Sequence, residues 1–156
     1  MPDTPTLCTI GYEGATVASF LAALRDAGVE LLVDVRALAS SRRPGFAKTA
    51  LTANLASVGI DYLHLRGLGT PADGRAAARA GRHDEMKRIF LEHMNEDVAR
   101  EELARLATIV RGDRKVCLLC FEADPMHCHR RYVVEALEPL VPVRVVHLFA
   151  KDEWEE

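Results

Sequence analysis

Thirteen residues, from Cys120 to Tyr132, hold many of the side chains in this sequence that could do chemistry. The stretch reads CFEADPMHCHRRY and contains two cysteines, two carboxylates, two histidines and two arginines. An apolar segment at 116–121 precedes it, and apolar residues at helical spacing follow it over 132–140. The cluster is therefore expected where a strand ends and a helix begins, which is where open α/β sheets build their sites.

The arginines suggest anion binding. Helical spacing places Arg130 beside the apolar stripe that faces the sheet, whereas Arg131 lies four residues before Glu135 and can pair with it on the outer face. A helix N-terminus that carries an arginine favours negative charge. Arg130 would act together with arginines of the loop that follows the second strand: Arg36, Arg42 and Arg43.

Two carboxylates at strand ends, Asp34 and Glu122, are the candidate catalytic groups. Beside a guanidinium a carboxylate stays ionised, and it could then act as a general base or orient a sugar hydroxyl. In the alternative interpretation they only form ion pairs that organise the loops, Asp34 with Arg36 or Arg130. Further binding contacts are expected from three residues near the same strand ends: Tyr12, Glu13 and His129.

The cysteines allow two further chemistries. Cys128 is a candidate nucleophile that His127 or His129 would activate, and the nearby arginines would lower the pKa of its thiol. In the simpler alternative Cys128 is only a small buried residue. Cys117 and Cys120 point to opposite faces of one strand, so they cannot easily share a metal ion. A partial metal site remains from Cys120, Cys128 and His129. No cofactor is predicted, although a divalent metal is allowed, and all four cysteines are expected to be reduced thiols.

Five apolar runs are expected to form strands, and helices are expected between them. The strands are predicted at 7–10, 30–35, 60–65, 114–121 and 143–148, and the helices at 16–28, from about 47 to 58, and at 83–94, 98–110 and 132–140. Residues 67–81 are predicted to be a mobile loop, with a short helix at 75–80, that closes over the site.

This alternation predicts a single three-layer α/β domain with a mostly parallel five-stranded sheet and helices on both faces. The carboxyl ends of parallel strands meet at one edge of the sheet, so the candidate residues are expected to converge there. The domain is expected to span 1–156, with its core at 6–149 and a fraying acidic tail at 150–156.

The composition limits the classes of partner. The 156 residues carry a net charge of −3, so an anion site must be local, and bulk attraction to nucleic acid or to an anionic membrane is not expected. No apolar run is long enough to span a bilayer, and no signal-peptide core is present at the start. With cysteines expected to be reduced, a cytoplasmic protein is predicted.

Three motifs resemble the domain-of-unknown-function 488 family. They are Thr9-Ile10-Gly11-Tyr12, Leu32-Val33-Asp34-Val35-Arg36 with Ser41-Arg42, and Cys120-x-Glu122-x-x-Pro125-x-x-Cys128-His129-Arg130. The resemblance implies a compact α/β domain whose motif residues are these, and it implies no reaction.

The residues themselves favour an enzyme that acts on a phosphate-bearing, nucleotide-like substrate at the carboxyl edge of the sheet. One alternative is a non-catalytic module that binds a nucleotide or a nucleic-acid end with the same arginines. Another is a metal-dependent or thiol-dependent enzyme that uses Cys120 or Cys128.

Overall fold

The computed structural model of the protein describes residues 4–150, except the side chain of His127. Its centre is a five-stranded sheet in which every neighbouring pair is parallel, with the strand order β3-β2-β4-β1-β5. The strands are β1 (Thr6–Gly11), β2 (Leu31–Asp34), β3 (Asp61–His64), β4 (Val116–Cys120) and β5 (Arg144–Phe149). The predicted α/β fold with a parallel sheet is confirmed.

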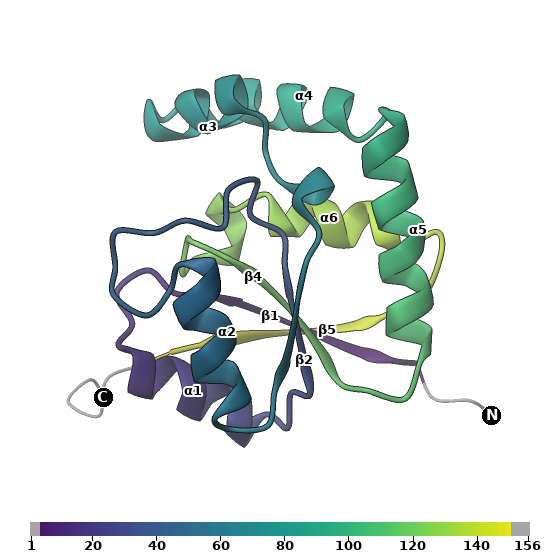
Figure 1. Ribbon diagram of the computed structural model, residues 1–156. Coiled ribbons are helices and arrows are strands. Elements are labelled where there is room, and N and C mark those ends of the chain that lie inside the picture. The colour runs from purple at the N-terminus through teal and green to yellow at the C-terminus, as the bar shows by residue number, and fades with distance from the viewer. Residues whose placement is uncertain (1–3, 151–156) are drawn as a thin grey trace.

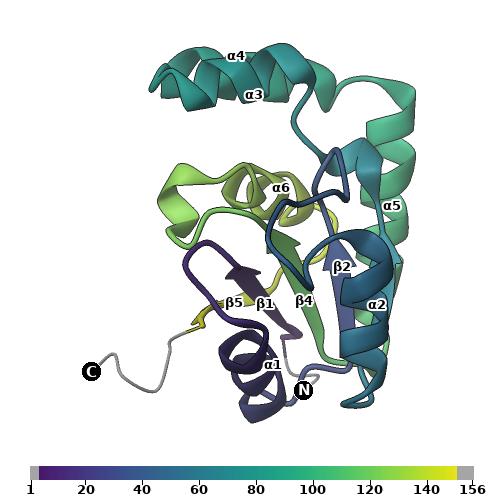
Figure 2. The ribbon, with the colours of Figure 1, turned by 60° about the vertical axis from the view of Figure 1, so that its left-hand side comes forward.

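Helices cover both faces of the sheet. One face carries α1 (Val17–Asp26) and α2 (Lys48–Ala56), and the other carries α5 (Asp97–Arg111) and α6 (Arg130–Leu137), as Figure 1 shows. The remaining helices are α3 (Ala72–Arg79), α4 (His83–His93) and two 3₁₀ turns, η1 (Arg66–Leu68) and η2 (Pro125–His127). Figure 2 shows that α3 and α4 lie beyond the end of the sheet toward which the strand arrows point.

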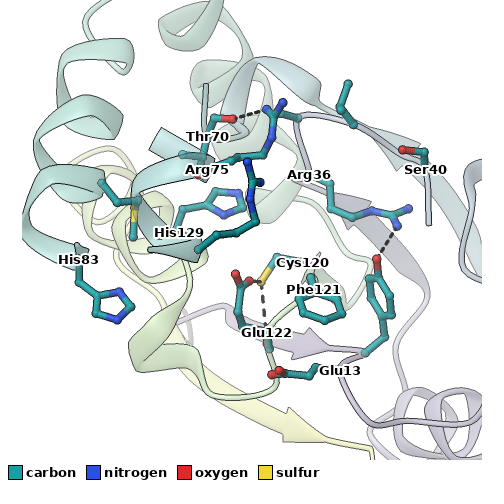
Figure 3. A pocket seen from close by; sticks show the side chains of 16 residues that line it. Glu13, Arg36, Ser40, Thr70, Arg75, His83, Cys120, Phe121, Glu122 and His129 are labelled. Carbon is teal, nitrogen blue, oxygen red and sulfur yellow. Dashed lines mark hydrogen bonds between the residues drawn. The ribbon is translucent and has the colours of Figure 1, made fainter. Parts of the chain in front are cut away.

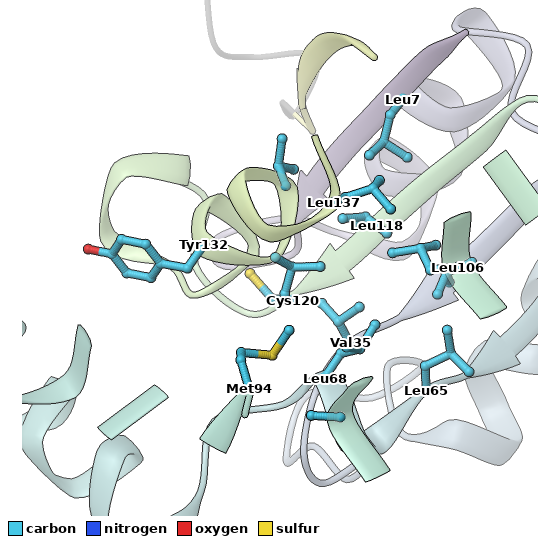
Figure 4. Packing of buried hydrophobic residues seen from close by; sticks show 14 of the residues in the cluster. Leu7, Val35, Leu65, Leu68, Met94, Leu106, Leu118, Cys120, Tyr132 and Leu137 are labelled. Atoms are coloured by element: carbon cyan, nitrogen blue, oxygen red, sulfur yellow. The ribbon is translucent and has the colours of Figure 1, made fainter. Parts of the chain in front are cut away.

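The inner strands are buried on both sides, which explains why their residues do not alternate between apolar and polar. Leu118 of β4 packs with Leu106 of α5 and Leu137 of α6 in the core of one face, part of which Figure 4 shows. Leu119, its neighbour in the strand, belongs to the core of the other face together with Phe20 of α1. Neighbouring residues of one strand therefore support two separate cores.

Residues 67–81 contain more helix than the predicted loop with a short helix at 75–80. They contain helix α3, and the chain then turns into α4, against which α3 packs. Alanines favour the helix, and Asp73 and Arg79 carry the charges that suit its two ends. Gly74, which suggests a loop in the sequence, is buried instead at the contact between the helices, where an added Cβ would lie 3.2 Å from Ile89.

The acidic tail at 151–156 lies outside the described residues. Over residues 4–150, no helix combines the length and the apolar character that crossing a bilayer requires.

Candidate functional site

A pocket of about 550 Å³ lies at the carboxyl edge of the sheet (Figure 3). The segments that follow β1, β2 and β4 line it, together with helices α3 and α4. The segment after β3 also reaches this pocket, through Thr70. Arg66 of that segment lines a second pocket of about 380 Å³, and the ring Nε2 of His64 lies 2.7 Å from the Arg36 carbonyl oxygen.

Two bonded sulfur atoms lie beside the pocket. Cys120, the last residue of β4, lines the pocket, and a disulfide joins it to Cys128. The prediction of four reduced thiols is therefore wrong for this pair. Turn η2 reverses the chain just after β4, which brings position 128 back beside the strand end. The two free cysteines, Cys8 and Cys117, are buried on the other face of the sheet, where burial raises the pKa of both thiols.

The Arg130 guanidinium is completely buried next to the disulfide. Its Nη1 donates to the Glu122 carbonyl oxygen at 2.8 Å and approaches Cys120 Sγ at 3.3 Å, and its Nη2 donates to the Ala123 carbonyl oxygen at 3.1 Å. Burial lowers the pKa of Arg130. The side chain therefore ties α6 to the loop after β4, and its positive charge lies against Cys120.

The turns after β1 and β4 are in unusually close contact. At Gly11 an added Cβ would lie 1.7 Å from the Glu122 carbonyl oxygen, so a larger residue would push the two segments apart. The Glu13 amide donates to the Phe121 carbonyl oxygen at 2.8 Å, and the Glu13 carboxylate accepts from the Ala123 amide at 3.1 Å. Glu13 lines the pocket, and it also holds the loop that follows Cys120.

His129 lies between the disulfide and β2. Its Nε2 is 2.7 Å from the Val35 carbonyl oxygen, which can only accept, so Nε2 carries the proton and Nδ1 carries a lone pair. Nδ1 is 3.7 Å from Cys128 Sγ. Burial lowers the pKa of His129 to about 4, so the ring is neutral at pH 7.

Asp34 and Arg36 form a buried ion pair, which is the alternative that the sequence left open. Arg36 Nη2 lies 2.7 Å from Asp34 Oδ2, and Arg36 Nε donates to both carboxylate oxygens. Tyr62 also donates to Oδ2 at 2.6 Å, and burial together with this hydrogen bond raises its pKa. Asp34 is 0% exposed and is not among the residues that line the pocket, whereas Arg36 is.

The other predicted binding residues lie around the same pair. Arg36 Nη1 donates to the Tyr12 hydroxyl at 3.2 Å, and the Tyr12 ring stacks on Phe46 with a centroid distance of 4.7 Å. Arg43 donates to the Tyr12 and Ala15 carbonyl oxygens. Arg42 is exposed and lies outside the pocket lining. Of the four predicted arginines, Arg36 lines the pocket and Arg43 shares its contact with Tyr12, whereas Arg130 lies beside Cys120 and Arg42 is exposed. The guanidinium groups of Arg36, Arg43 and Arg130 donate largely to protein oxygens.

Helices α3 and α4 contribute basic residues to the pocket that were not predicted from the sequence. Arg75, Arg79 and His83 line the pocket, and Arg75 donates to the Thr70 carbonyl oxygen at 2.8 Å. The signal was present in the sequence, since arginines four residues apart lie on one face of a helix. Both arginines lie in the short helix predicted at 75–80, but the segment was interpreted mainly as a mobile loop and neither arginine was assigned to the site.

Three side chains in this region could hold a metal ion. Within the described part of the chain, one group of ligand atoms lies close enough together, from Cys120, Cys128 and His129, with all three atoms within 4.8 Å of one another. This is the partial site expected from the sequence, and Cys117 is not part of it.

A scan against protein-family models matched one family, described as a domain of unknown function, DUF488, over residues 16–137. The chain belongs to this family. The match includes the second and third motifs quoted above, while the first, Thr9 to Tyr12, lies before the matched range. Searches of curated proteins and of solved structures gave no match for this DUF488 protein.

Proposed function

We propose that this DUF488 protein is an enzyme that carries out thiol–disulfide chemistry on a small anionic substrate. The observation that carries the proposal is the position of Cys120, which lines the pocket and is bonded to a second cysteine behind it. A pair of cysteines at a substrate pocket can exchange two electrons with a bound molecule, and this requires no other group.

The reaction starts from the reduced pair. The Cys120 thiolate attacks one sulfur of a substrate disulfide, which forms a mixed disulfide and releases the first substrate thiolate. Cys128 then attacks Cys120 Sγ, releases the second substrate half as a thiol and leaves the Cys120–Cys128 bond. The substrate gains two electrons and the pair loses two, and an external thiol returns the pair to its reduced form.

The neighbours of Cys120 suit this role. Arg130, with Nη1 3.3 Å from the sulfur, is placed to stabilise a Cys120 thiolate. Glu122 Oε2 lies 3.7 Å from the same sulfur and can return a proton to a departing thiolate. The lone pair on His129 Nδ1 can accept a hydrogen bond from the Cys128 thiol and so orient it.

The pocket lining indicates the substrate class. Guanidinium groups of Arg75 and Arg79 favour negative charge, and the exposed apolar side chains of Leu38 and Phe121 favour a partly apolar molecule. The same guanidinium groups support a second candidate, an enzyme that acts on a phosphate-bearing, nucleotide-like substrate.

The test mixes reduced protein with a dianionic aromatic disulfide whose released thiolate absorbs visible light. Cys120 supplies the attacking thiolate in this reaction, so wild-type protein should react at least about tenfold faster than Cys120→Ser. Cys128→Ser should release one thiolate and keep the other half as an adduct, visible by mass spectrometry. The control Cys8→Ser/Cys117→Ser should react like wild type.

The result that overturns the proposal is a Cys120→Ser variant that reacts as fast as wild type. Arg79→Gln should slow the reaction with the dianionic disulfide and leave the reaction with a neutral disulfide unchanged. If nucleotides raise the melting temperature of wild-type protein and of Cys120→Ser equally, and Arg79→Gln removes that shift, the nucleotide candidate replaces the thiol reaction.

A further inference from the structure

We propose that, once the Cys120–Cys128 bond is reduced, both thiolates and the His129 ring bind one Zn²⁺ ion, with a fourth position open to the pocket. The inference does not rest on the thiol reaction, because it requires only that the two cysteines be reduced. It concerns the same sulfur atoms, so a bound ion would also block Cys120 as a nucleophile.

The donor set is the first reason. Two thiolates and one imidazole are ligands that zinc prefers, and three protein ligands with one open position are typical of catalytic zinc sites. The three ligand atoms already lie within 4.8 Å of one another, and all three side chains are buried. Buried ligands keep water from competing for the ion on all sides except one.

The second reason is the orientation of His129. A zinc-binding histidine generally donates its other ring N–H to a carbonyl or a carboxylate, which fixes the tautomer. Here Nε2 lies 2.7 Å from the Val35 carbonyl oxygen, so Nδ1 is the bare nitrogen. In a tetrahedral site with Zn–S of about 2.3 Å and Zn–N of about 2.05 Å, nitrogen and sulfur are about 3.5 Å apart. The distance from His129 Nδ1 to Cys128 Sγ is 3.7 Å.

The third reason is the backbone spacing of the cysteines. Their Cα atoms are 7.3 Å apart. Two thiolates on one zinc ion need sulfur atoms about 3.8 Å apart, which this spacing allows after reduction.

Charge and access complete the argument. Zinc and two thiolates sum to zero charge, and the adjacent Arg130 and Glu122 carry opposite charges. Cys120 and His129 both line the pocket, so an ion held between them has one side toward bound solvent or substrate.

The test uses the whole protein, reduced and freed of reductant under anaerobic conditions. One equivalent of Zn²⁺ is added, excess metal is removed by gel filtration, and bound zinc is measured by elemental analysis. About one ion per chain is expected in the reduced protein and none in the oxidised protein. Substituted Co²⁺ should give thiolate-to-metal charge-transfer absorption and the visible bands of a tetrahedral site.

Matched variants assign the ligands. Cys120→Ser, Cys128→Ser and His129→Gln should each weaken binding by at least about tenfold, whereas Cys8→Ser/Cys117→Ser should bind like wild type. Because a variant in the core can fail to fold, zinc protection is measured in wild-type protein as well. Bound zinc should prevent alkylation of Cys120 and Cys128, mapped by mass spectrometry.

Reduced wild-type protein that retains no zinc, or zinc that leaves both cysteines open to alkylation, would overturn the inference. If the reduced protein binds no zinc but its Cys120 reacts rapidly with disulfides, the zinc site is refuted and the proposed thiol–disulfide reaction is kept. If the protein binds one zinc ion tightly but Cys120 of the metal-free protein does not react with disulfides, the zinc site is kept and the proposed thiol–disulfide reaction is refuted.

Discussion

Replacement of Asp34 by Asn should destabilise the protein by about 3–5 kcal/mol, because it leaves the buried Arg36 guanidinium without its counter-ion. The two side chains are 0% and 6% exposed, and their closest atoms are 2.7 Å apart, so solvent does little to screen the interaction. Asn keeps the shape of the side chain, so the loss is one of charge rather than of packing.

The assay is urea unfolding at pH 7, followed by circular dichroism, for wild type, Asp34→Asn, Arg36→Gln and the double variant. The double variant Asp34→Asn/Arg36→Gln removes both charges and leaves neither one unpaired. Its free energy of unfolding should therefore be about 1–3 kcal/mol higher than the sum of the two single effects predicts. An exposed pair serves as control, since Arg82 and Glu85 are also 2.7 Å apart; Glu85→Gln should cost less than about 1 kcal/mol.

A cost below about 1 kcal/mol for Asp34→Asn, or strictly additive effects in the double variant, would refute this reasoning. The ion pair would then be of little structural value, and the alternative from the sequence, in which Asp34 is a catalytic carboxylate, would regain its force.

Two further predictions concern the neighbouring residues. The pKa of His129 is lowered to about 4 in the folded protein, against about 6.5 in the unfolded protein, so the unfolded state binds the proton first as the pH falls. The free energy of unfolding should therefore drop by about 3 kcal/mol from pH 7 to pH 4. An equal pH dependence in His129→Gln would contradict this. Gly11→Ala should lower the free energy of unfolding by more than about 3 kcal/mol, because the added Cβ would meet the backbone of Glu122. In the control Gly14→Ala the Cβ meets nothing within 4 Å, so the loss should be about 1–2 kcal/mol. Equal losses in chemical unfolding would show that the contact at Gly11 is unimportant.

The parallel sheet could be predicted because its strands are continuous apolar runs, and such runs report directly on burial. Leu118 and Leu119, which serve opposite cores, are both apolar for that reason. The ion pair of Asp34 and Arg36 could be anticipated as one of two alternatives, since residues two apart at a strand end can reach each other around the turn. The choice between an ion pair and a catalytic carboxylate depends on how deeply Asp34 and Arg36 are buried, which no local sequence pattern shows.

Features that depend on distant segments were missed. The Cys120–Cys128 bond results from the turn at η2, and a spacing of eight residues does not report such a reversal. Helix α3 was predicted only in part, as a short helix at 75–80, whereas it begins at Ala72 and includes Gly74, whose lack of a side chain serves the contact with α4. Arg75 and Arg79 lie in the predicted part, but their place at the pocket depends on the packing of α3 against α4, which no local pattern shows.

The position of β1 has a consequence for how the chain folds. Both of its neighbours, β4 and β5, come from the last third of the sequence, so Leu7 pairs with Val116 and Val145. During synthesis β1 has no strand partner until β4 has left the ribosome. Such distant pairings slow folding and leave strand edges exposed to other chains. Truncation before β5 should therefore yield a protein that aggregates rather than a smaller folded domain.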